Sequence, residues 1–400
     1  MIKIGTPNIS LDNDYATLTN DIIIDGRCEK LWFKVSSEYA KYLTTERADA
    51  YLVLLFYYAM KHGHDMEFEV PVSERIYYQM KYYLIDALNQ EDPSFKNIQI
   101  QCTTECEPVV SENAVGTGMS GGIDSLSTIY LHTGEDCPQS YKLTHLTFFN
   151  SGAAHLPDGE RVLDKSGEDI FQKRVELAKT FAERTGLKLL VVDSNISELL
   201  KIDHTLTHTY RNCGTALLFQ KLFSVYYYSS AGVKYSTNYV SPNLDTGHYD
   251  DSIVPYISNN NITFYSTIIQ YTRFRKTKIL TDYNLSYEFL NVCITDSTNC
   301  GECSKCIRTL TTLDALGRLD RYRSVFDLEK YQKNRNRHIG WVVVNRKKDF
   351  YDEIYQCFKD NKKHIPFVSV LHALNYWVIG IIKKNIPQGI KDSIRKIIRK

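Results

Sequence analysis

The stretch Ser120-Gly121-Gly122-Ile123-Asp124-Ser125 decides how the rest of the chain is interpreted. It follows a short apolar run and precedes a segment with helical periodicity, so it is predicted to join a strand to a helix. A glycine-rich turn at a helix N-terminus leaves backbone N–H groups that point toward an anion. The loop therefore predicts a phosphate site. Since the acid at 124 would repel phosphate unless a divalent cation lay between them, it also implies Mg²⁺.

Composition limits the classes of protein that need to be considered. The 400 residues exceed what one core usually holds, and 43% hydrophobic with 24% charged residues is ordinary for a globular protein. A net charge of +1 gives no general attraction to nucleic acid, so nucleic acid is not an expected partner. The N-terminus lacks an apolar signal segment, and the apolar runs are too short to cross a bilayer. We expect a cytoplasmic protein without a transmembrane segment.

Residues 1–110 are predicted to form an α+β accessory domain. Strand-like and helical patterns alternate there without any catalytic signature, so a structural or partner-binding role is expected. The predicted strands cover 22–24, 31–35, 66–70 and 97–102, and the predicted helices cover 47–61 and 74–89, with Ser73 as the cap of the second.

Residues 111–317 show strands that alternate with helices, which is the pattern of an α/β fold with a doubly wound parallel sheet. Ligands bind at the carboxyl ends of the strands in such sheets, where the loop at 120–125 is expected to lie. The predicted strands cover 115–119, 143–150, 188–193 and 234–239, the predicted helices cover 166–184 and 213–229, and a further run at 288–293 leads into a cysteine cluster.

Residues 318–400 are predicted to be a mostly helical extension. Helices are expected at 347–360 and 367–382, with a strand at 340–344. The last twelve residues, from Gly389, place isoleucines on one helical face and Lys and Arg on the other. A terminal helix that packs its isoleucines on the protein is the preferred interpretation, and contact with an anionic membrane or RNA is the alternative.

Four cysteines lie close together in the sequence, at Cys293, Cys300, Cys303 and Cys306. Paired C-x-x-C spacing brings two sulfurs to one ion, and four thiolates complete a tetrahedral zinc site. Because such a site leaves no position for a reactive water, a structural zinc knuckle is predicted. Redox or sulfur-carrier cysteines and an iron–sulfur cluster are the alternatives.

The phosphate loop lacks the Gly-Lys-Ser/Thr ending of a Walker loop. It resembles instead the pyrophosphate loop of the PP-loop ATP pyrophosphatase superfamily. Asn150-Ser151-Gly152, Val175-Glu176-Leu177-Ala178 and Gly186-Leu187-Lys188 further resemble 7-cyano-7-deazaguanine synthases, and the cysteine cluster is similar to the zinc motif of that family. The resemblance covers about residues 114–316. It does not extend to the N-terminal domain, the C-terminal extension or the residues that read the deazaguanine ring.

The resemblance implies an adenine nucleotide alpha hydrolase-like fold of the HUP type, with ATP, Mg²⁺ and Zn²⁺ bound. The implied ATP-binding residues are Met119, Ser120, Gly121, Gly122, Asp124, Ser125, Asn150, Gly152 and Arg211. Asp124 would hold Mg²⁺, and Asp124 with Ser125 would act in catalysis. The basic run at 273–278 adds Arg273 and Lys276 as catalytic residues, because fixed cations stabilise a departing pyrophosphate.

The predicted function is that of an AMP-forming ligase that makes C–N bonds. A small-molecule carboxylate or amide would be adenylated, and ammonia or an amine would then displace AMP to give an amide or a nitrile. Three alternatives remain open: a tRNA-modifying thiolase, a ligase whose protein or polymer acceptor docks on residues 1–110, and a non-catalytic zinc module that only binds a nucleotide. His155, His204 and His208 lack ligand spacing and are interpreted as surface residues.

Overall fold

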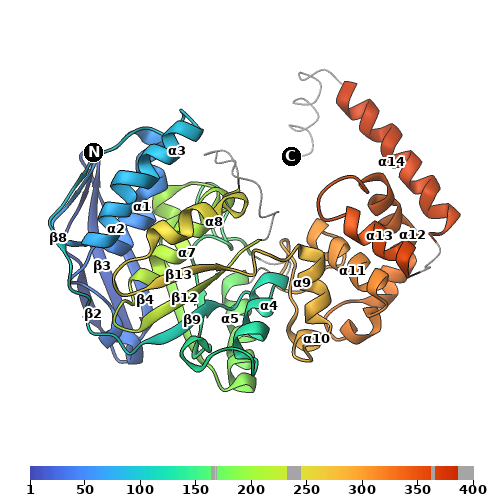
Figure 1. Ribbon diagram of the computed structural model, residues 1–400, viewed down its shortest axis with the longest axis horizontal. Helices are drawn as coiled ribbons and strands as arrows, with labels where there is room; N and C mark the ends of the chain where they lie inside the picture. The colour runs from blue at the N-terminus through green and yellow to red at the C-terminus, as the bar shows by residue number, and fades with distance from the viewer. Residues whose placement is uncertain (164–166, 168, 232–244, 362–364, 386–400) are drawn as a thin grey trace. The chain divides into compact units, whose positions relative to one another are not determined.

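The computed structural model describes residues 1–163, 167, 169–231, 245–361 and 365–385 (Figure 1). The chain divides into two compact units. The first comprises Met1–Lys276 with Phe289–Asn291, and the second comprises Thr277–Glu288 with Val292–Lys400. The boundaries that the sequence predicts near 110 and 317 therefore differ from the division by contacts, which lies near residue 276.

The strands of the first unit are β1 (Ile2–Ile4), β2 (Asn8–Leu11), β3 (Tyr15–Ile24), β4 (Arg27–Ser36), β5 (Met66–Phe68), β6 (Val72–Ser73), β7 (Ile100–Gln101), β8 (Thr104–Glu105), β9 (Ala114–Gly118), β10 (His145–Phe149), β11 (Lys188–Ser194), β12 (Phe223–Ser229) and β13 (Thr263–Thr267). Its helices are α1 (Asp49–His62), α2 (Glu74–Gln79), α3 (Ile85–Glu91), α4 (Ile123–Thr133), α5 (Ile170–Thr185), α6 (Ile196–Leu200), α7 (His208–Leu217) and α8 (Asp250–Ile253).

A mixed, mostly parallel sheet forms the centre of this unit. In the described residues it has 11 strands in the order β13-β12-β9-β10-β11-β4-β3-β1-β5-β7, with β2 beside β3. The run from β13 to β11 is parallel throughout. Within that run the chain moves outward from β9 to β10 and β11 and then returns to the other side of β9 as β12. Ligands bind at such a reversal of strand order, at the carboxyl ends of the strands.

The N-terminal strands continue the same sheet. β4 pairs antiparallel with β11, with Lys34 opposite Asp193 and Phe33 opposite Ser194. The backbone N–H of Trp32 also donates to the side chain of Asn195 at 2.8 Å. Sheet hydrogen bonds therefore cross the boundary near residue 110 that the change of pattern predicts.

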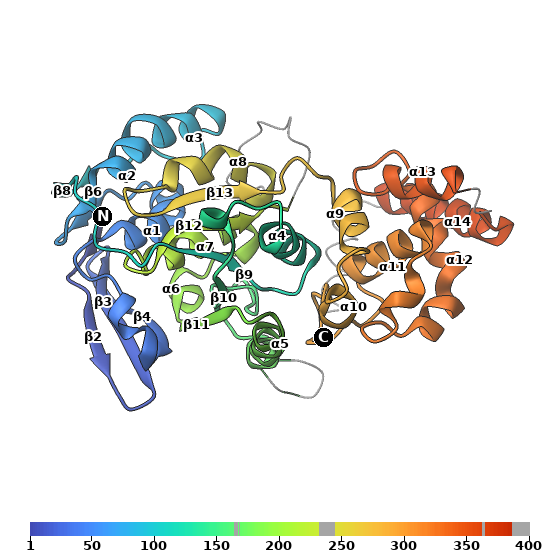
Figure 2. The same ribbon diagram turned by 60° about the horizontal axis from the view of Figure 1, so that its bottom comes forward.

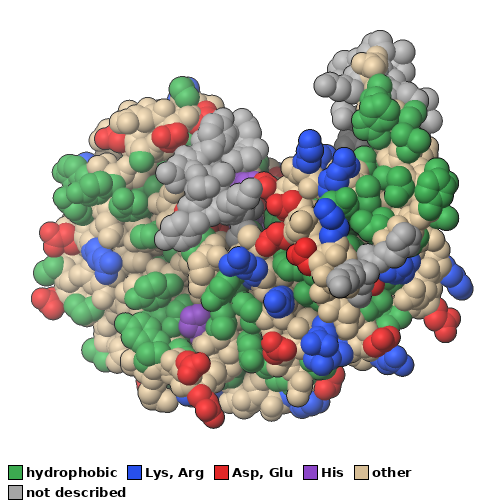
Figure 3. Space-filling view, turned by 45° about the vertical axis from the view of Figure 1, so that its right-hand side comes forward, with side chains coloured by type: hydrophobic (Ala, Val, Ile, Leu, Met, Phe, Trp, Pro, Cys, Tyr) green, Lys and Arg blue, Asp and Glu red, His purple; other side chains and the backbone are tan. Residues whose placement is uncertain are grey.

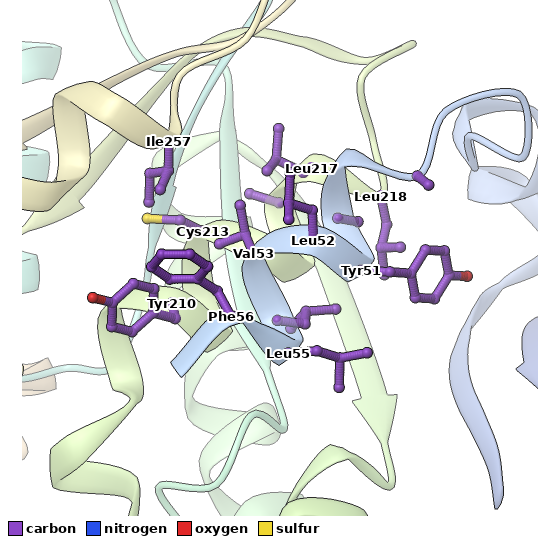
Figure 4. Packing of buried hydrophobic residues seen from close by; sticks show 14 of the residues in the cluster. Tyr51, Leu52, Val53, Leu55, Phe56, Tyr210, Cys213, Leu217, Leu218 and Ile257 are labelled. Carbon is purple, nitrogen blue, oxygen red and sulfur yellow. The ribbon is translucent and has the colours of Figure 1, made fainter. Parts of the chain in front are cut away.

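Helices cover both faces of the parallel strands. Figure 2 shows α4 and α5 on one side of β9, β10 and β11, with α1 and α7 on the other. Helix α1 is apolar nearly all round and is buried along most of its length, as expected for a helix enclosed on every side. Figure 4 shows Val53 and Phe56 of α1 against Tyr210 and Cys213 of α7. A side chain at Gly214 would lie 2.6 Å from Cγ of Leu54, so this glycine lets the two helices approach closely.

Several predicted elements are wrong in their type. The helix expected over 213–229 is two elements, because α7 ends at Leu217 and β12 begins at Phe223. The strand expected over 340–344 lies inside helix α12 (Leu328–Val344), and the run at 288–293 begins with the end of helix α10 (Ser286–Phe289). The strand expected over 234–239 and the terminal helix from 389 lie outside the described residues.

The second unit is helical. Besides most of α10 and all of α12 it contains the second half of α9 (Arg273–Leu280), and it continues with α11 (Ser304–Leu316), α13 (Asp352–Asp360) and α14 (Phe367–Asn385). Ser369 and Ala373 of α14 are buried, whereas much of the apolar remainder of this helix is exposed (Figure 3). None of the helices in the described part of the chain has the length and apolar content that crossing a membrane requires.

Two glycines of the second unit offer a matched test of its packing. A Cβ at Gly340 of α12 would lie 2.7 Å from Cβ of His372 and 2.8 Å from the carbonyl oxygen of Ser369, so Gly340→Ala must push α12 and α14 apart. We expect a loss of about 1–3 kcal/mol from overpacking, partly offset by the better helix propensity of alanine. The measurement is urea unfolding of the full chain.

Gly380→Ala is the control, because a Cβ at this position of α14 meets no described atom within 4 Å. It is expected to stabilise the helix by about 1 kcal/mol. Equal effects of the two substitutions would show that α12 and α14 do not pack closely at Gly340.

Candidate functional site

The loop at 120–125 lies between β9 and α4, with Gly122 at the N-cap position of the helix. Its serines bond to one another: Ser120 Oγ donates to Ser125 Oγ at 3.0 Å and accepts from the backbone N–H of Gly122 at 3.3 Å. Gly121 has φ of 73°, and a Cβ there would lie 3.2 Å from the carbonyl oxygen of Phe289. Glycine is therefore required at 121 both by backbone conformation and by space.

A cavity of about 220 Å³ opens beside this loop. The ends of β9, β10 and β12, the loop and the start of α7 form its walls, so it lies at the reversal of strand order. The lining residues are Gly118, Met119, Ser120, Ser125, Thr147, Phe148, Phe149, Ser151, Ala153, Arg174, His204, Asn212, Tyr226, Tyr227, Tyr228 and Ser229. Hydroxyl groups, aromatic rings and an arginine thus surround a space at the sheet edge where nucleotides bind in related architectures.

Arg273 and Lys276 meet at Asp124. Arg273 Nη2 lies 2.9 Å from Asp124 Oδ2, and Lys276 Nζ lies 3.2 Å from Oδ1. The Lys276 side chain is 0% exposed and also donates to the carbonyl oxygen of Ser230 at 2.7 Å. Burial lowers the pKa of Lys276, and the Asp124 carboxylate opposes that effect. The structure thus brings three predicted catalytic residues together, with two cations for one carboxylate.

The contacts of Asp124 with Arg273 and Lys276 limit how its carboxylate could bind Mg²⁺. Each carboxylate oxygen already faces a cation, and the side chain keeps 20% of its surface exposed. A metal ion at Asp124 would therefore share the carboxylate with Arg273 or Lys276 and take its remaining oxygens from phosphate and water. The assignment of Mg²⁺ to this residue stays a prediction.

Three other predicted ATP ligands lie behind the cavity wall and brace it. Arg211 is 1% exposed and donates to the carbonyl oxygens of Ser151 and Ile202 and to Ser197 Oγ, at 3.2, 2.9 and 3.1 Å. Gly152, with φ of 123°, would place a Cβ 2.5 Å from Arg211 Nη1. Asn150 donates to Asp193 Oδ1 at 2.6 Å. Burial lowers the pKa of Arg211 to about 10, and in this arrangement the arginine holds loops in place.

The histidines interpreted as surface residues are largely enclosed, which corrects that prediction. The His155 side chain is 2% exposed and its Nε2 lies 3.3 Å from Glu198 Oε1. His204 lines the cavity, and burial lowers its pKa well below the ordinary value. His208 lies 2.8 Å from Asp245 Oδ1 through Nε2 and also contacts the hydroxyl of Tyr228.

A buried carboxyl group lies beyond the cavity, in α8. Asp250 Oδ1 accepts from Ser230 Oγ at 3.1 Å and from Ser266 Oγ at 2.9 Å, whereas Oδ2 has no hydrogen-bond partner among the described residues. Burial raises the pKa of Asp250 to about 6. Asp250 thus links the residue after β12 to β13 through two hydrogen bonds. Burial destabilises its charged form, because the carboxylate is poorly solvated.

The second unit holds a candidate metal centre. The sulfur atoms of the four predicted cysteines all lie within 4.8 Å of one another. Zinc–sulfur bonds of about 2.3 Å place tetrahedral sulfurs roughly 3.8 Å apart, so a small closure would complete the site. The group could hold a metal such as zinc.

Local backbone geometry prepares the cysteines for an ion. Cys300 Sγ accepts from the N–H groups of Glu302 and Cys303 at 3.4 and 3.3 Å, across a turn that requires Gly301 at φ of 74°. Cys303 Sγ accepts from the N–H of Cys306 and caps α11. Burial raises the pKa of the Cys300 thiol, but these N–H groups and the Thr295 hydroxyl outweigh it and bring the pKa to about 6. Such hydrogen bonds favour the thiolate that a metal needs.

Sequence reasoning missed the aromatic part of the cavity. Tyr226 and Tyr228 fall within the helix predicted over 213–229, because a largely apolar run hides the turn between α7 and β12. A signal was present in Val225 and the three tyrosines that follow it, since β-branched and aromatic residues favour strands.

No family model matches this chain, and no curated protein or solved structure matches it significantly.

Proposed function

We propose that the chain is an AMP-forming ligase of the PP-loop ATP pyrophosphatase type. ATP would place its phosphates on the loop at 120–125 and its nucleoside in the adjoining cavity. A substrate carboxylate or amide oxygen would attack the α-phosphorus, and pyrophosphate would leave. Ammonia or an amine would then displace AMP and form the C–N bond.

One observation carries this proposal: Ser120 and Ser125 line a cavity at the carboxyl ends of β9 and β12, where the strand order reverses. The loop supports an anion through the N-terminus of α4, which has eleven residues and a positive dipole end at Ile123. Aromatic walls at Phe148 and Phe149 suit a planar base beside that anion site.

The paired cations supply the charge that the reaction requires. Asp124 neutralises one of Arg273 and Lys276, so the group keeps one positive charge beside the loop. A fixed positive charge stabilises the pyrophosphate that develops as the α–β bond breaks, and it needs no reorganisation during the step. Mg²⁺ bound with ATP would bridge phosphate oxygens and add to this stabilisation.

The cysteine cluster favours the ligase over a thiolase. A thiolase needs a mobile pair of reactive cysteines, whereas here all four sulfurs converge within 4.8 Å and two of them accept backbone N–H bonds. A closed site of this kind leaves no sulfur for transfer chemistry.

The test combines ATP turnover with a substitution that fills the cavity. The full chain is incubated with Mg²⁺, a metabolite extract and ATP labelled in the α-phosphate. Production of AMP and pyrophosphate is expected, because the loop holds the β and γ phosphates as the leaving group. Formation of ADP and phosphate would contradict the proposal, and so would a complete lack of turnover.

Gly118→Val should weaken ATP binding by more than about tenfold, because the valine side chain would occupy part of the cavity. Gly118 ends β9 and lines the cavity, and a Cβ there meets no described atom within 4 Å, so the strand itself should tolerate valine. Equilibrium dialysis with ATP measures the loss, and thermal unfolding checks the fold. Gly118→Ala is the matched smaller change and should cause a smaller loss. Unchanged binding in Gly118→Val would place ATP elsewhere.

A further inference from the structure

A chain of hydrogen bonds runs from Asp245 to the cavity through His208 and Tyr228. Asp245 Oδ1 lies 2.8 Å from His208 Nε2, and His208 Nδ1 contacts the hydroxyl oxygen of Tyr228. Thr209 Oγ1 donates to the same hydroxyl oxygen at 3.1 Å. Tyr228 lines the cavity, whereas His208 and Asp245 do not, and the Asp245 side chain is 46% exposed.

The polypeptide holds each member of this chain in place. Asp245 Oδ1 also accepts from the N–H of Gly247 at 2.8 Å, which caps the short 3-10 turn at Thr246–His248. His208 is the first residue of α7 and its carbonyl oxygen accepts from Asn212 Nδ2 at 2.8 Å. The rings of His208 and Tyr228 lie nearly parallel, at 11°. These contacts hold Asp245, His208 and Tyr228 in position.

The protonation states of these three residues determine which way a proton can move. Burial raises the pKa of Asp245, but His208 outweighs it and brings the pKa to about 2, so Asp245 is a carboxylate that accepts from Nε2–H. In the neutral tautomer with its proton on Nε2, His208 Nδ1 accepts the Tyr228 hydroxyl proton. Burial raises the pKa of Tyr228 well above its ordinary value, so the tyrosine keeps its proton at rest.

The phenol oxygen has capacity for one more partner. It donates to His208 and accepts from Thr209, which leaves one lone pair. A ligand N–H in the cavity could donate to that lone pair. The arrangement has the same logic as a nucleophile, a histidine base and an orienting carboxylate, with tyrosine as the group that faces the substrate.

We propose that Asp245, His208 and Tyr228 form a proton relay that deprotonates the nitrogen nucleophile in the C–N bond-forming step. This proposal rests on the proposed function and names the base for its second half-reaction. As nitrogen attacks the adenylated carbon, its proton passes to Tyr228 Oη while the tyrosine proton passes to His208 Nδ1. The new C–N bond replaces the C–O bond to AMP, which leaves with the bonding electrons. Asp245 stabilises the imidazolium until the proton is released to water.

The relay acts on nitrogen transfer and not on adenylation, so its test separates the two half-reactions. The full chain is given Mg-ATP and a metabolite extract, first alone and then with hydroxylamine as the nitrogen probe. Pyrophosphate formed without hydroxylamine reports adenylation, and hydroxamate formation reports nitrogen transfer. Tyr228→Phe should keep adenylation within about threefold and lower hydroxamate formation by about 100-fold, the range typical of general base catalysis.

His208 is a positioning residue within the relay and needs a readout that a structural role would not change. His208→Ala should lose hydroxamate formation to a similar extent, and added imidazole should restore part of the rate, because it can occupy the space and accept the tyrosine proton. Asp245→Asn should also lower hydroxamate formation, because the imidazolium loses its counter-charge.

Tyr210→Phe is the matched control. Tyr210 lies two positions after His208 in α7 and is buried, and its hydroxyl has no hydrogen-bond partner among the described residues. The Tyr210→Phe variant should catalyse both half-reactions at the wild-type rate. If the wild-type chain forms no AMP, the proposed function fails. If the wild type is active and Tyr228→Phe forms hydroxamate at the wild-type rate, the relay fails and the ligase stands.

Discussion

Cys306→Ser is expected to empty the metal site and unfold the second unit. Structural zinc contributes about 10–16 kcal/mol of apparent binding free energy in small zinc-binding peptides, as much as the whole stability of a typical domain. Cys306 is 0% exposed and its N–H donates to Cys303 Sγ, so it joins the metal site to the start of α11. Metal content should fall from about one ion per chain to none, and the unfolding transition of the second unit should disappear.

Elemental analysis measures the metal, and thermal unfolding with and without a chelator measures the stability. Cys357→Ser is the control, because this cysteine lies in α13 of the same unit, outside the cluster. It should retain the ion. Full metal content in Cys306→Ser, or a wild-type chain that contains no metal after growth in zinc, would contradict a four-cysteine site.

Asp250→Asn is expected to stabilise the first unit at neutral pH. The pKa of Asp250 is about 6 in the fold against an ordinary value of 3.8, because burial penalises its charge. The free energy of unfolding of the wild type should therefore fall as pH rises from about 4 to about 6 and then level off, by at most about 3 kcal/mol. Asparagine keeps an oxygen for Ser230 and Ser266 and carries no charge, so this fall should vanish and about 1–3 kcal/mol should be gained.

Urea unfolding at a series of pH values between 4 and 8 checks this result. Asp251→Asn makes the same change of charge one residue later, where the side chain is only partly buried. If Asp251→Asn altered the pH profile as much as Asp250→Asn, the effect would not come from the buried site. A wild-type stability that rises between pH 4 and 6 in the first unit would have the opposite sign to the expected one.

Features that are local in the sequence could be predicted. Adjacent glycines and hydroxyl-bearing residues predict the phosphate loop at 120–125, and the spacing of the cysteines predicts the metal site. The alternating pattern from 111 onward correctly indicated a mixed α/β architecture with a mostly parallel sheet. In each case the residues that determine the structure lie within one or two turns of chain.

Features that depend on distant partners could not be predicted. The run from Cys213 to Ser229 is largely apolar, and the position of β12 between β9 and β13 divides it into helix and strand. The three valines at 342–344 favour a strand by propensity, yet Gly340 packs closely against α14 and the segment is helical. Tertiary packing overrides propensity at both places.

The candidate site shows the same limit. Asp245, His208 and Tyr228 come from a loop, a helix and a strand, and their meeting depends on the path of the sheet. The resemblance implies that Arg211 binds ATP, whereas the structure encloses it behind the loop that contains Gly152. Charge can be read from a sequence, but the direction in which a buried side chain points cannot.

The pairing of β4 with β11 also has a consequence for synthesis on the ribosome. Trp32 and its partner Asn195 are 163 residues apart, and at about 5–20 residues per second the partner follows roughly 8–30 s later. The hairpin of β3 and β4 can form early, but during that interval one edge of β4 has unpaired N–H and C=O groups. An open edge invites pairing with another chain. Nascent chains of this protein should therefore depend on chaperones until β11 emerges, and slow codons between these strands should lower the soluble yield.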